Sequence, residues 1–303
     1  MQMVPVPQRI PSTQGVGREA AECVTKLTIP QRERRRALIA PREHGAWGML
    51  VVPLVTGATV GLLTGGRVGP VLLLSTAVIA LFWMRTPLES WLGTSPVRVQ
   101  TTEEHRLVLS VMLPLAAIMA VNVTVLFSQG KNRGLIWLGL ISGVAFATQM
   151  FLKRMRTTRM AAEVVGALAL TLTAPAAYYV STGRLDARAW ALWLVNWLFA
   201  AGQIQFVWLT IRGARATGFS EKFTLGWRFL AAQVLLGVIL TLACELGWLP
   251  KLTLLAFVPV LFRGLLWFAK RPQPIVIRRL GWTELVHAVA FGILLTASFC
   301  LVS

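Results

Sequence analysis

Three ionisable residues stand where the chain enters its first long apolar run. Arg42, Glu43 and His44 lead directly into the apolar residues 45–63. Charged groups beside hydrocarbon must be paired, hydrated or used, so this placement points to a functional role. A histidine titrates near neutral pH and can share proton transfer with a neighbouring carboxylate. We therefore predict that Glu43 and His44 are catalytic acid–base residues.

Further polar residues are expected at the same membrane face. Glu163 and Glu284 stand near the starts of apolar segments, and His287 follows Glu284 by three positions, which places both on one helix face. Arginine suits the binding of an anionic head, because its guanidinium makes paired hydrogen bonds to phosphate or carboxylate. The predicted substrate-binding residues are Arg42, Arg85, Glu89, Arg106, Glu163, Arg263, Glu284 and His287.

These residues also have structural interpretations. Acids such as Glu103 and Glu104 are typical of helix starts, where the helix dipole favours them, and a buried Glu–Arg pair can be purely structural. His44, His105 and His287 raise a minor alternative, a haem or metal site. No local ligand spacing supports that alternative, so we predict no metal, and the cofactor stays unknown.

The composition is that of a membrane protein. Of 303 residues, 55% are hydrophobic and only 14% are charged, whereas roughly a quarter of a soluble domain is charged. The formal net charge of +18 could suggest a nucleic-acid partner. The Lys and Arg residues lie between apolar runs, however, so membrane topology explains them better and no nucleic acid is expected. The three cysteines show no metal or redox spacing.

The apolar runs predict an all-α, polytopic membrane protein. A helix needs roughly 20 apolar residues to cross a bilayer, and backbone groups in lipid must bond within their own segment. We expect nine spans, at residues 45–63, 68–84, 107–127, 134–152, 161–181, 189–211, 228–247, 251–268 and 283–302.

The basic residues predict an N-in, C-out orientation. All but six of the 30 Lys and Arg residues fall on the side of the N-terminus, and such an excess marks the cytoplasmic side. Residues 85–106 and 212–227 are expected as long inner loops, so a site is expected at the cytoplasmic face. The six outer residues are Arg67, Lys131, Arg133, Arg184, Arg188 and Lys251.

Two regions are expected along the chain. Residues 1–40 predict a flexible basic arm, with a helix near residues 31–39, and residues 41–303 predict a single transmembrane domain. The run of basic residues over 32–36 is typical of segments that set topology and contact anionic lipid headgroups. Membrane lipids, with anionic lipid at the inner face, are therefore the expected partners.

The sequence Pro-Arg-Glu-His-Gly-Ala-Trp-Gly-Met-Leu at 41–50, followed by Val-Pro-Leu-Val-Thr-Gly at 52–57, resembles the signature of the YwiC-like family of bacterial membrane proteins. The likeness is expected to run from about residue 38 to the end, with residues 85–88 and 163–166 as further familiar points. It implies a multi-pass protein of the bacterial cytoplasmic (inner) membrane. It implies topology more than chemistry, because the family is poorly characterised.

The chain is also similar, more distantly, to the UbiA superfamily of intramembrane prenyltransferases. That likeness implies a UbiA-like arrangement of nine helices, N-in, with functional loops after spans two and six. UbiA enzymes hold a prenyl diphosphate through Mg²⁺ and closely spaced aspartates, since Mg²⁺ prefers hard oxygen ligands. The corresponding loops here contain no Asp and offer Glu89, Glu103 and Glu104 in the first and Glu221 in the second.

Two functional hypotheses follow. The first is a UbiA-like transferase, or a degenerate transferase, that acts on a lipid-soluble, isoprenoid-type substrate whose anionic head binds at the cytoplasmic face. The alternative is a non-catalytic transporter, or a lipid- or cofactor-binding assembly protein. Transport would be favoured by inverted repeats with broken helices, and no convincing internal repeat is present.

Overall fold

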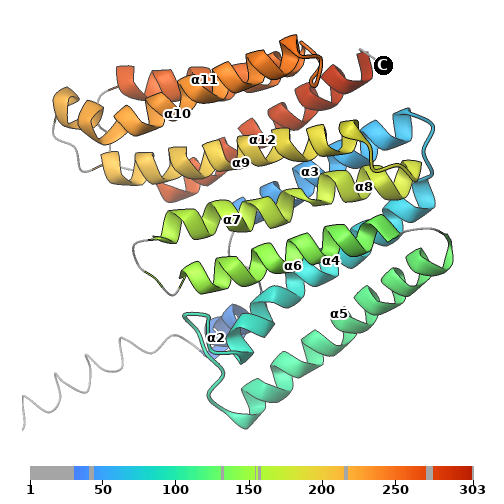
Figure 1. The fold of residues 1–303 in the computed structure, drawn as a ribbon. Coiled ribbons are helices and arrows are strands. Elements are labelled where there is room, and N and C mark those ends of the chain that lie inside the picture. Colours follow the sequence, from blue (N-terminus) through green and yellow to red (C-terminus); the bar gives the residue numbers. More distant parts are fainter. Residues whose placement is uncertain are drawn as a thin grey trace, which may run out of the picture. The chain divides into compact units, whose positions relative to one another are not determined.

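The computed structural model describes residues 31–40, 44–130, 133–153, 155, 158–214, 218–270 and 276–301. Over these residues the regular structure is helical (Figure 1). The helices are α2 (Gln31–Ile39), α3 (His44–Leu63), α4 (Val68–Trp91), α5 (Thr102–Ser128), α6 (Arg133–Lys153), α7 (Arg159–Thr171), α8 (Thr173–Thr182), α9 (Ala187–Gly213), α10 (Phe219–Glu245), α11 (Thr253–Ala269) and α12 (Ile277–Leu301).

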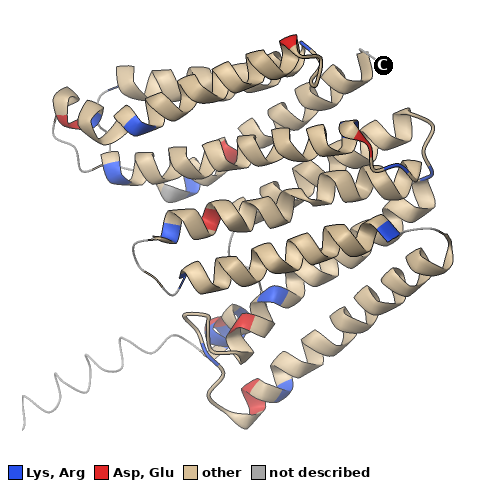
Figure 2. Ribbon diagram, in the orientation of Figure 1, with Lys and Arg blue, Asp and Glu red and all other residues tan. Residues whose placement is uncertain are grey.

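The helices confirm an all-helical, multi-pass membrane protein. Eight helical stretches in the described part of the chain are long and apolar enough to cross a bilayer, with α7 and α8 together forming one of them. The 17-residue α11 is apolar but shorter. Each of the nine predicted segments therefore corresponds to a helix or a helix pair. Lys, Arg, Asp and Glu are sparse along the middles of the helices, which suits a hydrocarbon surrounding (Figure 2).

The prediction of two long inner loops is wrong in extent. Helix α4 continues to Trp91, past Pro87, and α5 already begins at Thr102. Helix α10 begins at Phe219, nine residues before the predicted start at residue 228. An apolar run shows which part of a helix lies in lipid, but not where the helix begins or ends. Polar residues can continue the helix, as the Arg85–Glu89 pair does across one turn of α4.

The chain divides into two compact units. Unit 1 contains α2 together with residues 84–112, and unit 2 contains the described residues of 42–83 and 113–303. In unit 1, Arg34 of α2 bonds to Glu104 (2.6 Å) and to the Arg98 carbonyl (2.9 Å). The helix predicted near residues 31–39 is thus confirmed, and it is anchored to the first turn of α5 and to the segment before it.

Helix α3 is central to unit 2, where it packs against α7, α8, α9 and α12. The close approach of α3 to α8 depends on Gly57, because a Cβ atom there would lie 2.0 Å from the Ala174 carbonyl oxygen. The sequence of α3, rich in glycine, is therefore explained by helix packing. Buried aromatic rings of α9, α11 and α12 continue the core, with Phe199 stacked on Phe291 at 3.8 Å.

The predicted span over residues 161–181 is interrupted near its middle. Helix α7 ends at Thr171 and α8 begins at Thr173, with Leu172 between them in a right-handed helical conformation. Pro175 has no N–H to donate to the Thr171 carbonyl, which explains the break at this point. The two short helices still form one continuous span, Arg159–Thr182.

Candidate functional site

A buried ion pair joins α11 to α12 in unit 2. The Arg263 Nη1 atom donates to Glu284 Oε1, and the two side chains are only 12% and 10% exposed. Glu284 lies about two turns into α12, a position flanked by lipid-exposed apolar residues such as Leu285 and Val286. Charges at such positions are costly unless they are paired, so this pair is the leading functional candidate among the described residues.

Helix α9 completes the surroundings of this pair. The Arg263 guanidinium lies over the Phe206 ring, 3.9 Å from its centroid, in a cation–π contact. One turn earlier, Gln203 Nε2 donates to the backbone carbonyl of Glu284 at 3.1 Å. Helices α11 and α12 therefore supply the two partners, and α9, distant in sequence, contacts both of them.

Part of the hydrogen-bonding capacity of the pair is unused. Arg263 Nε and Nη2 and Glu284 Oε2 are buried, and none has a hydrogen-bond partner among the described residues. The Nε and Nη2 groups form one edge of the guanidinium, a fork whose geometry matches two oxygens of a carboxylate or phosphate. Arg263 could therefore bind a second oxyanion through Nε and Nη2 while Nη1 stays bonded to Glu284.

His287 lies on α12 one turn beyond Glu284 and close enough to interact with it electrostatically. Its Nδ1 atom is 2.6 Å from the Thr283 carbonyl oxygen. A carbonyl can only accept, so Nδ1 carries the hydrogen in this arrangement. The other ring nitrogen is then an acceptor in the neutral imidazole, which places a proton-exchanging group next to the pair.

The start of α3 lies beside the start of α12. A Cβ atom on Gly48 would lie 3.7 Å from Leu285 Cδ1, so Gly48 lies at the level of Glu284. His44, the first residue of α3, precedes Gly48 by about one helical turn. The side chain of His44, and Arg42 and Glu43 altogether, lie outside the described residues. The catalytic role of Glu43 and His44 therefore stays a prediction.

Glu163 has a tryptophan as its hydrogen-bond partner. It is half-buried near the start of α7 and accepts a hydrogen bond from the Trp208 indole of α9 at 2.6 Å. Trp208 in turn lies under Arg212, 5.1 Å from its ring centroid. Glu163 thus belongs to a contact between α7 and α9, whereas Glu284 is held by Arg263 and Gln203.

The remaining predicted residues lie in unit 1. Arg85 and Glu89 form an ion pair one turn apart at 2.9 Å, and Arg106 is exposed near the start of α5. The convergence of these residues with Arg263 and Glu284 in a single chamber stays a prediction. Within the described residues no group of three His, Cys, Asp or Glu side chains could hold a metal ion. The side chain of His44, one of the three histidines, lies outside them, so the three-histidine alternative stays untested.

Two features were missed from the sequence. Lys222 is only 3% exposed, and its ammonium donates to the Trp267 and Lys270 carbonyls at the end of α11. A cavity also lies at the opposite ends of the helices, beside Asp186. A signal for that cavity was present, because the single Asp of the chain is flanked by Arg184 and Arg188.

Comparisons with known proteins agree with the resemblance drawn from residues 41–57. Residues 40–178 match the model of the family described as YwiC-like protein. The chain is also 26% identical over 259 residues to the uncharacterized protein YwiC of Bacillus subtilis (strain 168), a match that covers 84% of this chain and 95% of that relative. A search of the solved structures gave no significant match. The YwiC-like resemblance is confirmed, and the UbiA-like arrangement stays a prediction.

Proposed function

We propose that this chain, which is similar to the YwiC-like proteins along most of its length, is a bacterial cytoplasmic-membrane protein that binds the anionic head of a lipid-soluble, isoprenoid-type ligand at Arg263. The observation that carries the proposal is the unused Nε–Nη2 edge of Arg263, buried beside Glu284. A guanidinium edge in a low-dielectric site binds a phosphate or carboxylate more strongly than it would in water.

Access from the bilayer supports a lipid-soluble ligand. Leu266, one turn beyond Arg263 on the same face of α11, is 36% exposed, so an apolar tail could lie along this helix in the membrane. The anionic head would then reach Arg263 without crossing the polar surface. Anionic lipid at the inner face is the expected neighbour of this site, because basic residues are concentrated on that side in the N-in orientation.

Catalysis is a separate step of the proposal. Glu43 and His44 would act as the acid–base pair, with Arg42 beside them in the chain, and the substrate-binding roles of Arg85, Glu89 and Arg106 stay a prediction. Glu284 would exchange a proton with His287 or tune the charge of the bound head. Without Asp-rich motifs, binding of the head is expected to depend on arginine rather than on Mg²⁺.

Binding can be tested on the full-length protein in neutral phosphatidylcholine nanodiscs with radiolabelled farnesyl diphosphate as the probe. Arg263→Gln is expected to weaken binding at least tenfold, which corresponds to a loss of about 1.4 kcal/mol of binding free energy. Arg263→Lys keeps the charge and should lose only part of the binding. Arg228→Gln removes an exposed arginine at the same ends of the helices and should bind normally. Equal binding by Arg263→Gln and the wild type would refute the proposal.

Turnover is tested by adding quinone or haem precursors as prenyl acceptors. An enzyme should form a prenylated product that disappears in the Glu43→Gln, His44→Ala double variant while probe binding remains. Product formation that survives in this double variant would remove Glu43 and His44 from the mechanism. Binding without any product, with or without added Mg²⁺, would identify a non-catalytic lipid-binding protein.

A second candidate, proton-coupled transport, rests on a different observation. Glu284 and His287 are titratable, lie one turn apart on α12 and stand next to an intramembrane arginine, as in many proton relays. Transport predicts that proteoliposomes with a pH-sensitive dye inside show substrate-dependent acidification, which Glu284→Gln abolishes. Probe binding that leaves the internal pH unchanged would favour the lipid-binding function.

A further inference from the structure

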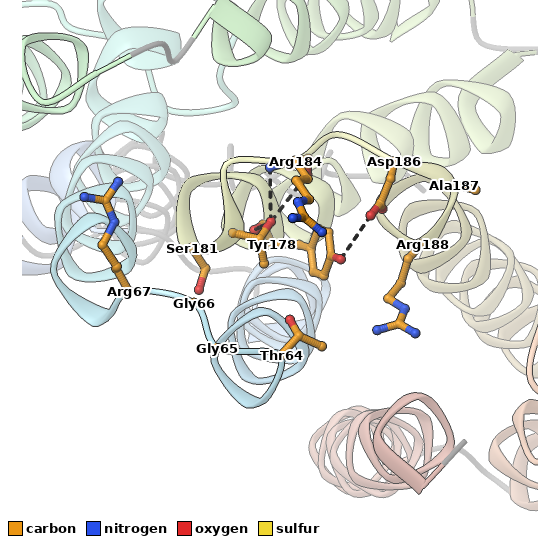
Figure 3. Close-up of a pocket in the computed structure, with 11 residues that line it drawn as sticks. Thr64, Gly65, Gly66, Arg67, Tyr178, Ser181, Arg184, Asp186, Ala187 and Arg188 are labelled. Carbon is orange, nitrogen blue, oxygen red and sulfur yellow. Dashed lines mark hydrogen bonds between the residues drawn. The ribbon is translucent and has the colours of Figure 1, made fainter. Parts of the chain in front are cut away.

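A cavity of about 740 Å³ lies at the ends of α3 and α8 and the starts of α4 and α9 in unit 2 (Figure 3). Its lining includes three arginines, one from the α3–α4 turn and two from the region where α8 passes into α9. The charged residues of the lining are Arg67, Arg184, Asp186 and Arg188, and its hydroxyl-bearing residues are Thr64, Tyr178, Ser181 and Thr182.

Two tight turns build the walls of this cavity. Gly65 and Gly183 have φ angles of +88° and +73°, a conformation that side chains with a Cβ rarely adopt. The Arg67 N–H donates to the Ser181 carbonyl at 2.9 Å, which ties one turn to the other. A Cβ on Gly66 would lie 2.0 Å from Ser181 Oγ. The backbone therefore fixes where the arginines emerge.

The single acid of the cavity is already engaged. Asp186 Oδ1 accepts the Ala189 N–H at 3.1 Å, as the N-cap of α9, and Oδ2 accepts the Tyr178 hydroxyl at 3.3 Å. Figure 3 shows this second bond, with Arg184 and Arg188 on the same segment as Asp186. Both arginines interact electrostatically with the Tyr178 hydroxyl. The carboxylate is therefore held in place by two hydrogen bonds, and its single negative charge offsets only one of the three guanidinium charges.

The arginines leave an excess of positive charge. Among the described residues, no ion pair joins Arg67, Arg184 or Arg188 to a carboxylate. Three cations and one acid therefore share a cavity whose remaining polar groups are hydroxyls and backbone. Concave sites lined by one sign of charge focus the electrostatic potential and concentrate counter-ions. Such a lining is complementary to an anion with several oxygens.

This cavity is distinct from the Arg263–Glu284 site. Gly48 of α3 lies at the level of Glu284, and Thr64 of α3 lines the cavity. These positions are 16 residues apart, or roughly 24 Å at about 1.5 Å per helical residue. That separation is most of the thickness of a hydrocarbon core, about 30 Å. The two sites therefore lie toward opposite membrane faces.

We infer that the cavity is a second binding site, for a phosphate group, formed by Arg184 and Arg188 with Arg67 at its edge. The guanidinium groups supply paired N–H donors for phosphate oxygens, and Thr64 supplies a hydroxyl. The phosphate can belong to an anionic lipid headgroup of the outer leaflet or to a soluble phosphate compound. Its chemistry is the same in both cases.

The test uses the full chain with the Arg184→Gln, Arg188→Gln double variant. One arm measures enrichment of phosphatidylglycerol around the protein in nanodiscs of nine parts phosphatidylcholine to roughly one part phosphatidylglycerol, by native mass spectrometry. The other arm measures pyrophosphate binding by calorimetry in pure phosphatidylcholine. The wild type should bind in at least one arm, and the double variant at least tenfold more weakly in that arm. Loss in the lipid arm identifies a headgroup, and loss in the pyrophosphate arm a soluble phosphate.

Two matched variants make the test decisive. Arg133→Gln removes an exposed arginine at the same ends of the helices, next to the Gly134–Tyr179 contact but outside the cavity lining, and should bind as the wild type does. Arg184→Lys, Arg188→Lys keeps the charge and should retain part of the binding. The inference is overturned if the wild type binds neither probe, if the double Gln variant binds normally, or if Arg133→Gln loses as much binding.

Discussion

Arg263 of α11 and Glu284 of α12 form an ion pair in which both side chains are about nine-tenths buried, at 12% and 10% exposure. The pair connects the short apolar helix α11 to a full-length span, and it is held from α9 by Phe206 and Gln203. Because both residues lie among lipid-exposed apolar side chains, each depends on the other for compensation of its charge.

Removing one partner of this pair should destabilise the protein strongly. Glu284→Gln is expected to lower the free energy of unfolding by about 3 to 5 kcal/mol, because it leaves the Arg263 charge buried without its carboxylate. The double variant Arg263→Met, Glu284→Leu should recover most of that loss. Thermal unfolding of the detergent-solubilised proteins measures both effects.

An exposed pair provides the control for this first prediction. Lys251 and Glu245 are 3.5 Å apart, with side chains 75% and 65% exposed, so Lys251→Gln should cost less than about 1 kcal/mol. Equal destabilisation by Lys251→Gln and Glu284→Gln would contradict the view that burial makes the Arg263–Glu284 pair important.

Gly57 should not tolerate even a methyl group. Gly57→Ala places a Cβ atom 2.0 Å from the Ala174 carbonyl oxygen, so α3 and α8 must separate, at a cost of about 1 to 3 kcal/mol. Gly143→Ala in α6 meets no atom within 4 Å and should be neutral or slightly stabilising. Melting temperatures of the two variants test the difference, and a neutral Gly57→Ala would show that the α3–α8 contact is looser than described.

The anchoring of α2 should persist at alkaline pH. The Glu104 carboxylate raises the pKa of the Arg34 guanidinium above its ordinary value. A group whose pKa is higher in the folded than in the unfolded state stabilises the folded form at every pH below its unfolded-state pKa. That stabilisation is lost only when the pH rises above this value. Arg34→Gln should therefore speed tryptic cleavage within α2 to the same extent at pH 7 and pH 9.

Arg35 offers a matched comparison for that experiment. Its pair with Glu103 has side chains 56% and 80% exposed, so Arg35→Gln should change the cleavage rate at the remaining sites of α2 little. A protective effect of Arg34 that disappears between pH 7 and pH 9, or an equal effect of Arg35, would count against the Arg34–Glu104 anchor.

Lys222 is expected to hold the end of α11. Lys222→Met removes the ammonium that donates to the Trp267 and Lys270 carbonyls. Amide hydrogen exchange over residues 266–270 should therefore accelerate. Lys270→Met changes an exposed side chain and keeps the carbonyl acceptor, so its exchange should match the wild type. Unchanged exchange in Lys222→Met would exclude this capping role.

Much of the fold could be predicted because hydropathy is a local property. Each predicted apolar segment corresponds to a helix or helix pair. The ends of α4 and α10 were missed, since residues such as Arg85 and Glu89 continue a helix beyond its apolar stretch. Hydropathy cannot locate a helix end that polar residues extend.

The site was predictable only in part. The sequence named both Arg263 and Glu284 as substrate-binding residues, but nothing local showed that they pair with each other. The hydrogen-bond partner of Glu163 is the Trp208 indole, which no local pattern indicated. Such pairings depend on which faces of distant helices meet.

The sequence by itself determined that this is a helical protein of the membrane, because the free energy of transferring each apolar run into lipid depends on that run alone. Tertiary structure decided which charges meet. Helix packing brought Arg263 to Glu284, placed Gln203 behind them, and gathered Arg67, Arg184 and Arg188 around one cavity. Those contacts join residues up to about 120 positions apart, and no local pattern records distances in space.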